Sequence, residues 1–507
     1  MNEEKPQLKV GLLLNYLNLL LSSFIPLFYT PIMLRILGQE EYGLYKLSGS
    51  ITSYLSLIAF GLGAAITRYL IKARIEVGEQ EERKVLGLFV RIFRAIALLT
   101  LAIGTIIAFI TPFFYTASLS SENLTKMQIL IILLTINTAI NFLASPYISI
   151  VNAHERFFFL QSTAILGTCL GPILNLIALF LGYASLGLAI SSLLATIVLR
   201  ILFVIYVQHS MQIKPLFQSM PQSYIKDILG FSLWIFVSNI VGQLYEATDI
   251  TLIGAIPALS TIGVAIYNIG MVFNGMISSI NTGLSSLLIP KANKMVFSGA
   301  SPTILTDTAI RIGRIQAIIL SLFIFGFITF GRPFIHFYAG DNYADAYWIA
   351  ILCMIPNTIP LIQSFCLNIV IARNENKFRA LTYLSVAILN VVATWYALKI
   401  FGIIGAALAT SLASFLGAGL AMNWFYKYRV KLQIGRFWKS VAKVFLPVIL
   451  LCMCFLFLSK FIDFYNIVNF IGGIVSFTLI YIILTWFLTM NNYEKNIIRN
   501  ILHKQVA

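Results

Sequence analysis

Charged residues are scarce in this sequence. Only 11% of its 507 residues are Asp, Glu, Lys or Arg, whereas 59% are hydrophobic and the mean hydropathy is +0.89. Soluble domains carry about 25% charged residues, so the composition excludes an ordinary soluble protein. Apolar runs of about 20 residues, each long enough to cross a hydrocarbon core, recur along the whole chain. The composition therefore predicts an all-α integral membrane protein.

Cysteine and histidine are also rare, and their spacing favours neither a metal nor a redox site. The chain has five Cys and four His, and the C-x-C sequence at 452–454 lacks the C-x2-C spacing of such sites. We expect all five cysteines to lie within helices as packing residues. No GxxxxGK[ST] sequence is present, so no P-loop ATPase is predicted. We expect no metal and no cofactor.

Acidic residues are the scarcer of the two charge types, which leaves a formal charge of +16. With the N-terminus in the cytoplasm, 29 of the 35 Lys and Arg fall in alternate, cytoplasmic segments such as 68–94 and 427–443. This distribution follows the positive-inside rule and predicts that both termini are cytoplasmic. The basic charge thus indicates topology, and no nucleic-acid partner is expected.

The apolar runs predict about 14 transmembrane helices joined by short loops. The longest loops, near 208–227 and 427–440, have about twenty residues, too few for a folded catalytic domain. We therefore expect the activity to take place within the membrane and expect no enzyme. The predicted spans lie near 10–33, 44–67, 86–111, 127–151, 157–182, 184–207, 228–253, 262–289, 309–331, 345–371, 379–399, 403–425, 441–459 and 465–489.

The chain repeats itself at an offset of about 220 residues. Arg91 and Arg94 fall on Arg311 and Arg314, and the ILN sequence at 173–175 recurs, with a small gap, at 388–390. These matches predict two pseudo-symmetric six-helix lobes and a C-terminal helix pair. Because six is even, both lobes start on the same side of the membrane, as in transporters that place their substrate path between parallel repeats. The expected parts are 1–219, helices 1–6; 220–430, helices 7–12; and 431–507, helices 13 and 14 with a cytoplasmic tail.

Several predicted helices carry polar residues at helical spacing. Such stripes mark a side that faces protein or water rather than lipid. One interpretation is hydrogen bonding between helices, which Ser, Thr and Asn commonly provide in membranes. The other is a hydrated cavity between the two lobes, which under the family resemblance given below would bind sugars. The candidates for the cavity lining are Asn15, Asn18, Tyr29, Asn141, Asn239, Gln243, Asn274 and Asn281.

Two acids, Glu246 and Asp249, lie three residues apart within the predicted seventh helix. An ionised side chain at the bilayer centre costs about 2.5–3.5 kcal/mol on insertion scales, so the pair requires a reason. One interpretation is an ion pair at the outer end of the helix, with Arg35 as partner. The other is a pair that binds H⁺ or Na⁺ and couples it to transport, because two neighbouring carboxylates share protons readily.

Arginines cluster at the predicted helix ends. Arg is suited to phosphate because its planar fork donates two parallel hydrogen bonds. Ordinary positive-inside anchoring explains the same positions equally well. The candidates for binding a phosphate group, which the resemblance given below makes a pyrophosphate, are Arg35, Arg68, Arg91, Arg94, Arg311 and Arg314.

Three stretches carry a family resemblance: LRILGQEEYGLYKL at 34–47, AFGLGAAITRYL at 59–70, and YEATDITLIGAIPALSTIGVAIYNIG at 245–270. The pattern R-x-L-G-x-x-E-Y-G-L-Y after an apolar first helix resembles the polysaccharide transporter family. These are the Wzx-type O-antigen or lipid-linked oligosaccharide flippases of the MOP (MATE-like) exporter superfamily. The last stretch looks like the start of that family's second half, with its Asp at position 249. Glu246 matches no family motif.

The resemblance implies a flippase that moves an undecaprenyl-(pyro)phosphate-linked oligosaccharide from the inner to the outer leaflet of the bacterial cytoplasmic membrane. It also implies contact with membrane lipids and with the polysaccharide polymerase machinery. A lipid II flippase for peptidoglycan and a cation-coupled multidrug exporter of the same superfamily are the alternatives. A membrane glycosyltransferase that uses Glu40 and Glu41 is a further rival, but its outer loop of about ten residues is too short to hold an acceptor.

Overall fold

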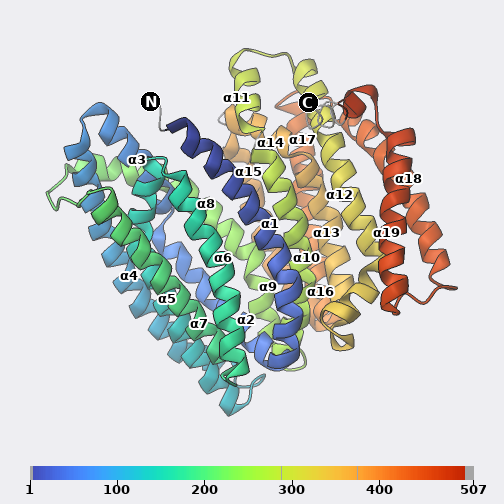
Figure 1. Cartoon of the computed structure of the whole chain (residues 1–507), viewed down its shortest axis with the longest axis horizontal. Helices are drawn as coiled ribbons and strands as arrows, with labels where there is room; N and C mark the ends of the chain where they lie inside the picture. The colour runs from blue at the N-terminus through green and yellow to red at the C-terminus, as the bar shows by residue number, and fades with distance from the viewer. Residues whose placement is uncertain (1–3, 287, 374, 497–498, 500–507) are drawn as a thin grey trace. The chain divides into compact units, whose positions relative to one another are not determined.

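The computed structural model describes residues 4–286, 288–373, 375–496 and 499, and these form helices joined by short loops, with no strand among them (Figure 1). Twelve of the described helices are long and apolar enough to cross a membrane, and one bent helix pair brings the number to 13. The prediction of an all-α membrane protein is confirmed, and the predicted number of spans is approximately right. The five cysteines all lie in helices, as expected.

The predicted second span, 44–67, is not a continuous helix. It consists of α2, the 3-10 helix η1 and α3, each shorter than a membrane span. The break falls at Phe60 and Gly61, whose φ angles of 48° and 70° lie in the left-handed region and end a right-handed helix. A Cβ on Gly61 would approach the Ser232 carbonyl oxygen to 2.7 Å, so the tight packing here requires glycine.

The chain divides into two compact units, residues 1–265 and 266–507, and the division falls within α10. It lies about one helix later than the predicted lobe boundary at residue 219, and the predicted parts stay predictions. The elements of the first unit are α1 (Glu4–Leu37), α2 (Gln39–Ser53), η1 (Tyr54–Ala59), α3 (Leu62–Glu76), α4 (Glu79–Tyr115), α5 (Ser121–Ala153), α6 (Phe157–Phe180), α7 (Ala184–Ile205), the π-helix η2 (Tyr206–Ser210), α8 (Gln222–Glu246) and α9 (Thr248–Ala255).

In the first unit, α4, α5 and α7 pack side by side, and α1 lies along α6. A buried cluster joins α3, α4 and α5 through Ile66, Leu70, Phe89, Phe93 and Ile150. Each of these side chains is at most 1% exposed. Ser120 fixes the start of α5 by accepting a hydrogen bond from the Asn123 backbone N–H at 3.3 Å.

The second unit contains most of α10 and everything after it. Its elements are α10 (Ser260–Ser286), α11 (Ile289–Phe297), α12 (Pro302–Tyr338), the 3-10 helix η3 (Asp341–Tyr343), α13 (Ala346–Ile362), α14 (Ser364–Ala372), α15 (Asn376–Phe401), α16 (Ile403–Ser414), the π-helix η4 (Phe415–Ala421), α17 (Met422–Tyr428), α18 (Ile434–Leu458), α19 (Ile467–Leu484) and the π-helix η5 (Thr485–Thr489).

The last two spans, α18 and α19, attach to the second unit through α12. Phe330 of α12 lies at the centre of an aromatic cluster, with Phe455, Phe464, Phe470 and Phe477 around it at centroid distances of 5.1 to 6.3 Å. Such ring pairs contribute about 0.5–1.5 kcal/mol each beyond their buried area. The C-terminal helices are therefore firmly packed against α12 within the second unit.

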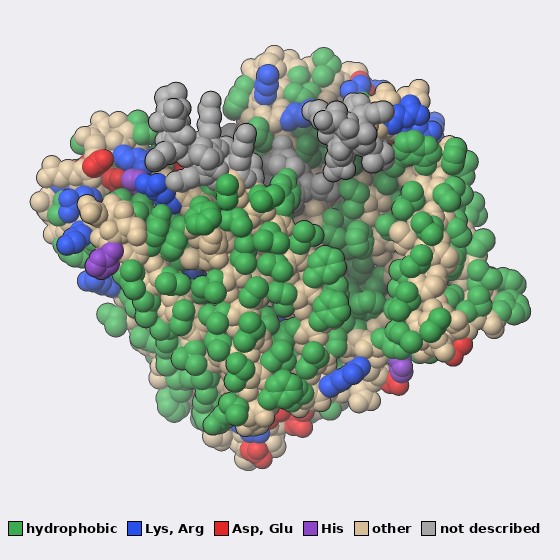
Figure 2. Space-filling view, in the orientation of Figure 1, with side chains coloured by type: hydrophobic (Ala, Val, Ile, Leu, Met, Phe, Trp, Pro, Cys, Tyr) green, Lys and Arg blue, Asp and Glu red, His purple; other side chains and the backbone are tan. Residues whose placement is uncertain are grey.

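The helix order repeats as the sequence predicts. The helices α2, α6 and α7 begin at residues 39, 157 and 184, and α10, α15 and α16 begin at 260, 376 and 403, which is 219 to 221 residues later. The two longest helices, α4 and α12, both have 37 residues. Within each unit, Figure 2 shows hydrophobic side chains covering most of the visible face, with Lys and Arg gathered mainly at one end of the helices.

Candidate functional site

The two acids of the predicted seventh span lie on either side of a helix break. Glu246 ends α8, Ala247 follows as a turn residue, and Asp249 lies in the first turn of α9. Asp249 is 1% exposed. The N-terminus of a helix favours a carboxylate because its free backbone N–H groups carry partial positive charge. The side chain of Glu246 lies outside the described residues.

Polar side chains of α2 and η1 hold this break in place. The Ser50 hydroxyl donates to the Ala247 carbonyl oxygen at 2.7 Å, and the Tyr54 hydroxyl lies 2.9 Å from the Thr248 hydroxyl. Gln243, a predicted sugar-binding residue, accepts a hydrogen bond from Ser53 at 2.9 Å and donates to Ser56 at 3.1 Å. The polar side of the predicted seventh span thus packs against another helix inside the first unit.

Arg35, proposed as the ion-pair partner of Asp249, is exposed in the last turn of α1, whereas Asp249 is buried. The ion pair between the two stays a prediction. The role of Arg35 in binding pyrophosphate stays a prediction.

Asn141, a predicted cavity-lining residue on α5, hydrogen-bonds an arginine that was not among the predicted site residues. The Arg200 side chain, half-buried on α7, donates through Nε to Asn141 Oδ1 at 2.8 Å. An ionisable residue within a span is by default a candidate functional residue. The available signal was the position of Arg200 inside the apolar run 184–207, where topology alone does not require a basic residue.

Three of the predicted sugar-binding residues of the first unit retain polar groups without a partner. No hydrogen bond joins the Asn15 or Asn239 side chain to another described residue. The buried Tyr29 hydroxyl lies near the Asn175 side chain but makes no hydrogen bond of standard geometry with a described residue. Asn18 differs, because its Oδ1 accepts from the Thr168 hydroxyl at 2.9 Å. Asn15, Tyr29 and Asn239 are thus better placed than Asn18 to hydrogen-bond a ligand.

In the second unit, polar residues of α10 hydrogen-bond residues of α12 and α13, and α12 in turn hydrogen-bonds α14. Asn357 of α13 donates to Asn274 Oδ1 and to the Ser278 hydroxyl, both at 2.9 Å. Asn281, 3% exposed, donates to Ser285 at 3.2 Å. Gln316 of α12 donates to Ser285 at 3.3 Å and to Ser364 at 2.7 Å.

This second polar group lies where the α13–α14 span bends by 48°. Asn357 and Gln316 were not predicted as site residues, although both lie in predicted spans, because neither belongs to a series of polar residues at helical spacing. The hydrogen bonds match the helix–helix interpretation of the stripes. Whether the same residues also bind sugar stays a prediction.

The arginines of the first unit contact the segments beside them. The Arg91 guanidinium donates to the Gln218 carbonyl oxygen, and that of Arg94 lies 5.4 Å from the centroid of the Phe217 ring. Arg68 lies 4.4 Å from the Phe231 ring centroid. All three side chains are exposed, so they keep access to an anion in addition to these contacts.

The matching pair in the second unit behaves differently. Arg311 is exposed and stacks over the Tyr493 ring at 5.0 Å, whereas Arg314 is 6% exposed. Arg314 makes a bidentate ion pair with Glu494, at 2.6 Å and 3.0 Å, and donates to the Ser440 and Thr489 carbonyl oxygens. Its donors are occupied by the C-terminal segment, so binding a pyrophosphate would require displacing Glu494.

The two acids in the first turn of α2, Glu40 and Glu41, are engaged in packing contacts. Glu41 of α2 contacts the Lys126 ammonium of α5 at 2.8 Å and accepts hydrogen bonds from the hydroxyl and backbone N–H of Ser185. Glu40 accepts from Asn123 at 2.6 Å. Burial by itself would raise the pKa of the Glu41 carboxyl, but the hydrogen bonds from Lys126 and Ser185 outweigh it and lower the pKa. The motif glutamate therefore ties α2 to α5 and α7.

These features first define a class: a polytopic helical membrane protein with an internal repeat and with polar groups hydrogen-bonded inside its spans. Solved structures agree. A structure of the lipid II flippase MurJ in an inward closed conformation is similar, with a TM-score of 0.71, 17% identity, and coverage of 94% of this chain and 98% of that chain.

Two multidrug transporter structures are similar over somewhat less of the chain. A MATE family transporter of the MOP superfamily in an inward-facing conformation has a TM-score of 0.61, 15% identity, and coverage of 78% of this chain and 92% of that chain. The Vibrio cholerae MATE transporter VcmN in its bent form has a TM-score of 0.54, 14% identity, and coverage of 88% and 99%. At these identities the likeness establishes the fold. No curated protein sequence matches this chain.

The sequence itself identifies the family. The profile of the family described as "Polysaccharide biosynthesis protein" matches residues 10–295, more than half of the chain, and the chain belongs to this family. The predicted resemblance is thereby confirmed: the family is that of polysaccharide biosynthesis proteins, and the fold is that of the MurJ and MATE structures. Family and fold together are those of a membrane transporter rather than of a catalytic enzyme.

Proposed function

We propose that this protein is a flippase that moves an undecaprenyl-(pyro)phosphate-linked oligosaccharide from the inner to the outer leaflet by alternating access. The membrane is the bacterial cytoplasmic membrane, and the product supplies cell-surface polysaccharide synthesis. The family match over residues 10–295 is the observation that carries this proposal. We further expect the polysaccharide polymerase machinery to receive the product.

The physics of the substrate fits a protein with polar groups inside its spans. A sugar headgroup that enters hydrocarbon loses its hydrogen bonds to water, at a cost of about 2–7 kcal/mol per unpaired polar group. Side chains such as Asn15, Tyr29 and Asn239, which have hydrogen-bonding capacity left, can replace those bonds. The isoprenoid chain has no such cost and can stay in lipid throughout.

The pyrophosphate needs cations along its path. Arg35, Arg68, Arg91, Arg94 and Arg311 are exposed and offer guanidinium groups to it. We add Arg200, because an arginine held by Asn141 within a span provides an anchored positive charge at membrane depth. Arg314 is the weakest of the predicted candidates, because Glu494 already holds it.

The source of energy is a separate part of the proposal. The acids Glu246 and Asp249 would exchange H⁺ or Na⁺ if transport is ion-coupled. The variant with Glu246→Gln and Asp249→Asn tests this directly: transport that keeps its rate and its pH dependence would remove the coupling role.

Two alternatives share the fold. Lipid II is the same class of substrate with a different sugar, and the similarity to the MurJ structure makes it the first alternative. The MATE structures make a cation-coupled drug exporter the second. The two alternatives differ from the proposed function in the molecule that is transported, so a transport assay with different substrates distinguishes them.

The test uses the full chain reconstituted in liposomes. Lipid-linked oligosaccharide is placed in one leaflet, its appearance in the other is measured with an impermeant sugar-binding reagent, and an organic dye cation serves as competing cargo. We expect movement of the oligosaccharide without movement of the dye. Dye movement alone would overturn the flippase assignment in favour of a drug exporter, and equal transport of lipid II would assign the protein to peptidoglycan synthesis.

A further inference from the structure

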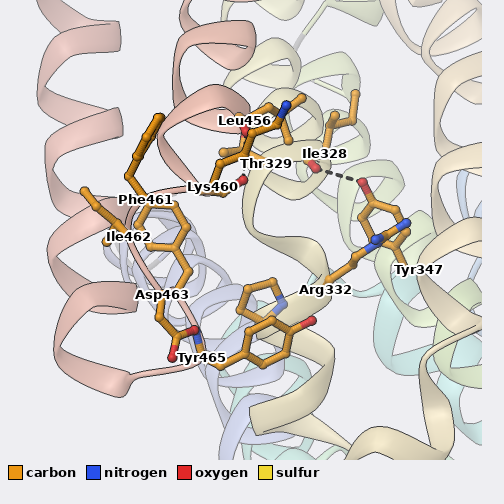
Figure 3. Close-up of a pocket in the computed structure, with 13 residues that line it drawn as sticks. Ile328, Thr329, Arg332, Tyr347, Leu456, Lys460, Phe461, Ile462, Asp463 and Tyr465 are labelled. Carbon is orange, nitrogen blue, oxygen red and sulfur yellow. Dashed lines mark hydrogen bonds between the residues drawn. The ribbon is translucent and has the colours of Figure 1, made fainter.

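A pocket of about 600 Å³ lies wholly within the second unit, between α12, α13, α18 and the segment 459–466 (Figure 3). Arg332 and Thr329 line it from α12 and Tyr347 from α13, while Lys460, Phe461 and Asp463 line it from the segment after α18. A pocket of this volume is in the ordinary range for small-molecule ligands. None of the residues discussed for the transported sugar lines it.

The pocket has two cations and one carboxylate. Among the described residues, neither Arg332 nor Lys460 has an acidic partner within 4.0 Å. The Asp463 carboxylate instead accepts a hydrogen bond from the Tyr465 backbone N–H at 2.9 Å. The lining therefore carries one unbalanced positive charge, which favours an anionic ligand.

Aromatic rings fix Arg332 in place. Its guanidinium lies 5.1 Å from the Tyr347 ring centroid and 5.3 Å from that of Trp348. In Figure 3, Arg332 extends from α12 toward Tyr347, whose hydroxyl donates to the Ile328 carbonyl oxygen at 2.8 Å. A stacked guanidinium loses little conformational freedom when its free N–H groups bind an anion, so it is preorganised for binding.

The depth of the pocket indicates what kind of anion can reach it. The spans α18 and α19 end and begin at Leu458 and Ile467, so residues 459–466 lie at a membrane surface. Phe461 is 73% exposed, Tyr465 50% and Trp348 45%, as expected for aromatic residues at the interface between lipid and water. Lipid phosphates lie at this level, and the positive-inside pattern predicts that it is the outer leaflet.

We propose that this pocket binds the phosphate group of an anionic membrane lipid, with Arg332 and Lys460 contacting its oxygens. The apolar side chains Leu456, Phe461 and Ile462 border the pocket and would contact the upper part of the acyl chain. A free phosphate ion would gain the charge contacts but leave these apolar groups unused. The site is independent of cargo transport and goes beyond the proposed function.

The experiment measures lipid retention by native mass spectrometry on the purified full chain. The probes are phosphatidylglycerol, phosphatidylcholine, a polyprenyl phosphate and inorganic phosphate. The variant pair is R332Q with K460Q, and the matched control is Lys399→Gln, which removes an exposed cation stacked on Trp395 at the end of α15. The single variant Lys460→Glu, on the exposed segment, tests the site if the double variant fails to fold.

We expect the wild-type chain and the Lys399→Gln variant to retain phosphatidylglycerol about tenfold better than phosphatidylcholine, a difference of about 1.4 kcal/mol. The double variant and Lys460→Glu should lose that preference. Retention of the polyprenyl phosphate by the same two cations would support the same lipid-phosphate chemistry. Displacement of the lipid by an equal concentration of inorganic phosphate would overturn the lipid assignment, and an unchanged preference in both pocket variants would overturn the site.

Discussion

At the scale of single residues, the charged groups of this protein divide by burial. Glu41, Arg314 and Glu494 are held by several partners each, whereas the ion pair between Arg436 and Asp307 is largely exposed. Charge-assisted hydrogen bonds strengthen as water is excluded, and exposed pairs contribute little. The number of hydrogen-bond partners of a charged residue and its burial therefore indicate its contribution to stability better than its charge alone.

The Glu41 carboxylate should make the stability of the first unit depend on pH. Its pKa is lower in the folded protein than the ordinary value of about 4.3, so its contribution is fully present above that value and is lost as the pH falls through the lower, folded value. Glu41→Gln should therefore cost about 1–2 kcal/mol near pH 7 and progressively less as the pH is lowered below about 4.3. Thermal unfolding of both proteins in detergent across this pH range measures the difference.

The control for this prediction is Glu122→Gln. Glu122 also contacts Lys126, at 2.9 Å, but its side chain is 76% exposed against 20% for Glu41. An exposed pair contributes about 0–1 kcal/mol, so the control should lose little. A destabilisation by Glu41→Gln that is the same at every pH would contradict the prediction.

The buried pair of Arg314 and Glu494 should show strong coupling in a double-mutant cycle. Removing one partner leaves the other charge buried and unpaired, so Arg314→Met or Glu494→Met alone should cost about 3–5 kcal/mol. The variant with both substitutions should recover most of that loss. The exposed pair of Arg436 and Asp307, 2.8 Å apart, is the reference cycle and should couple by less than about 1 kcal/mol. Additive single losses at Arg314 and Glu494 would show that the pair is not a unit.

At the scale of elements, close helix approach explains the glycine of the Y-G-L-Y motif. Gly43 of α2 faces the start of α10, where a Cβ would lie 1.8 Å from the Thr261 carbonyl oxygen. Gly49 lies in the same helix, and a Cβ there would meet nothing within 4 Å. The motif thus encodes a packing contact that hydrophobic periodicity alone does not reveal.

Gly43→Ala and Gly49→Ala should consequently have opposite effects on stability. The first forces the helices apart and should cost about 1–3 kcal/mol. The second replaces a flexible residue inside a helix and should gain about 0.5–1 kcal/mol. Unfolding of the two variants in the same detergent measures both effects. If Gly43→Ala were as stable as the wild type, the close approach of α2 and Thr261 would not hold in the protein.

The limits of sequence analysis are also visible in individual elements. The spans were predictable because each one requires a run of about 20 apolar residues to cross the hydrocarbon core, and such a run is visible in the sequence. The break at Phe60 and Gly61 was not predicted, because the surrounding residues are apolar enough to continue a span. Partners such as Glu494 for Arg314 and Arg200 for Asn141 were also missed, because 180 and 59 residues separate them and periodicity carries no information at that distance.

At the scale of the whole molecule, the charge of the proposed substrate supplies a driving force that requires no ATPase. Two negative charges on a pyrophosphate gain about 4–5 kcal/mol per 100 mV when they move outward, because an inside-negative potential drives anions out. This driving force depends only on the charge that crosses the membrane and on the potential, whichever arginines contact the phosphates. Its measurement therefore tests the proposed direction of transport without assuming a binding site.

In liposomes with a potassium diffusion potential, the share of lipid-linked oligosaccharide in the outer leaflet should rise when the interior is made negative and fall when it is made positive. A substrate with a single phosphate should respond about half as strongly, because the energy scales with the charge moved. The Glu246→Gln and Asp249→Asn variant separates this driving force from ion coupling: it should keep the dependence on potential even if it loses any dependence on pH. A distribution that ignores the potential for both substrates would show that the pyrophosphate charge does not drive transport.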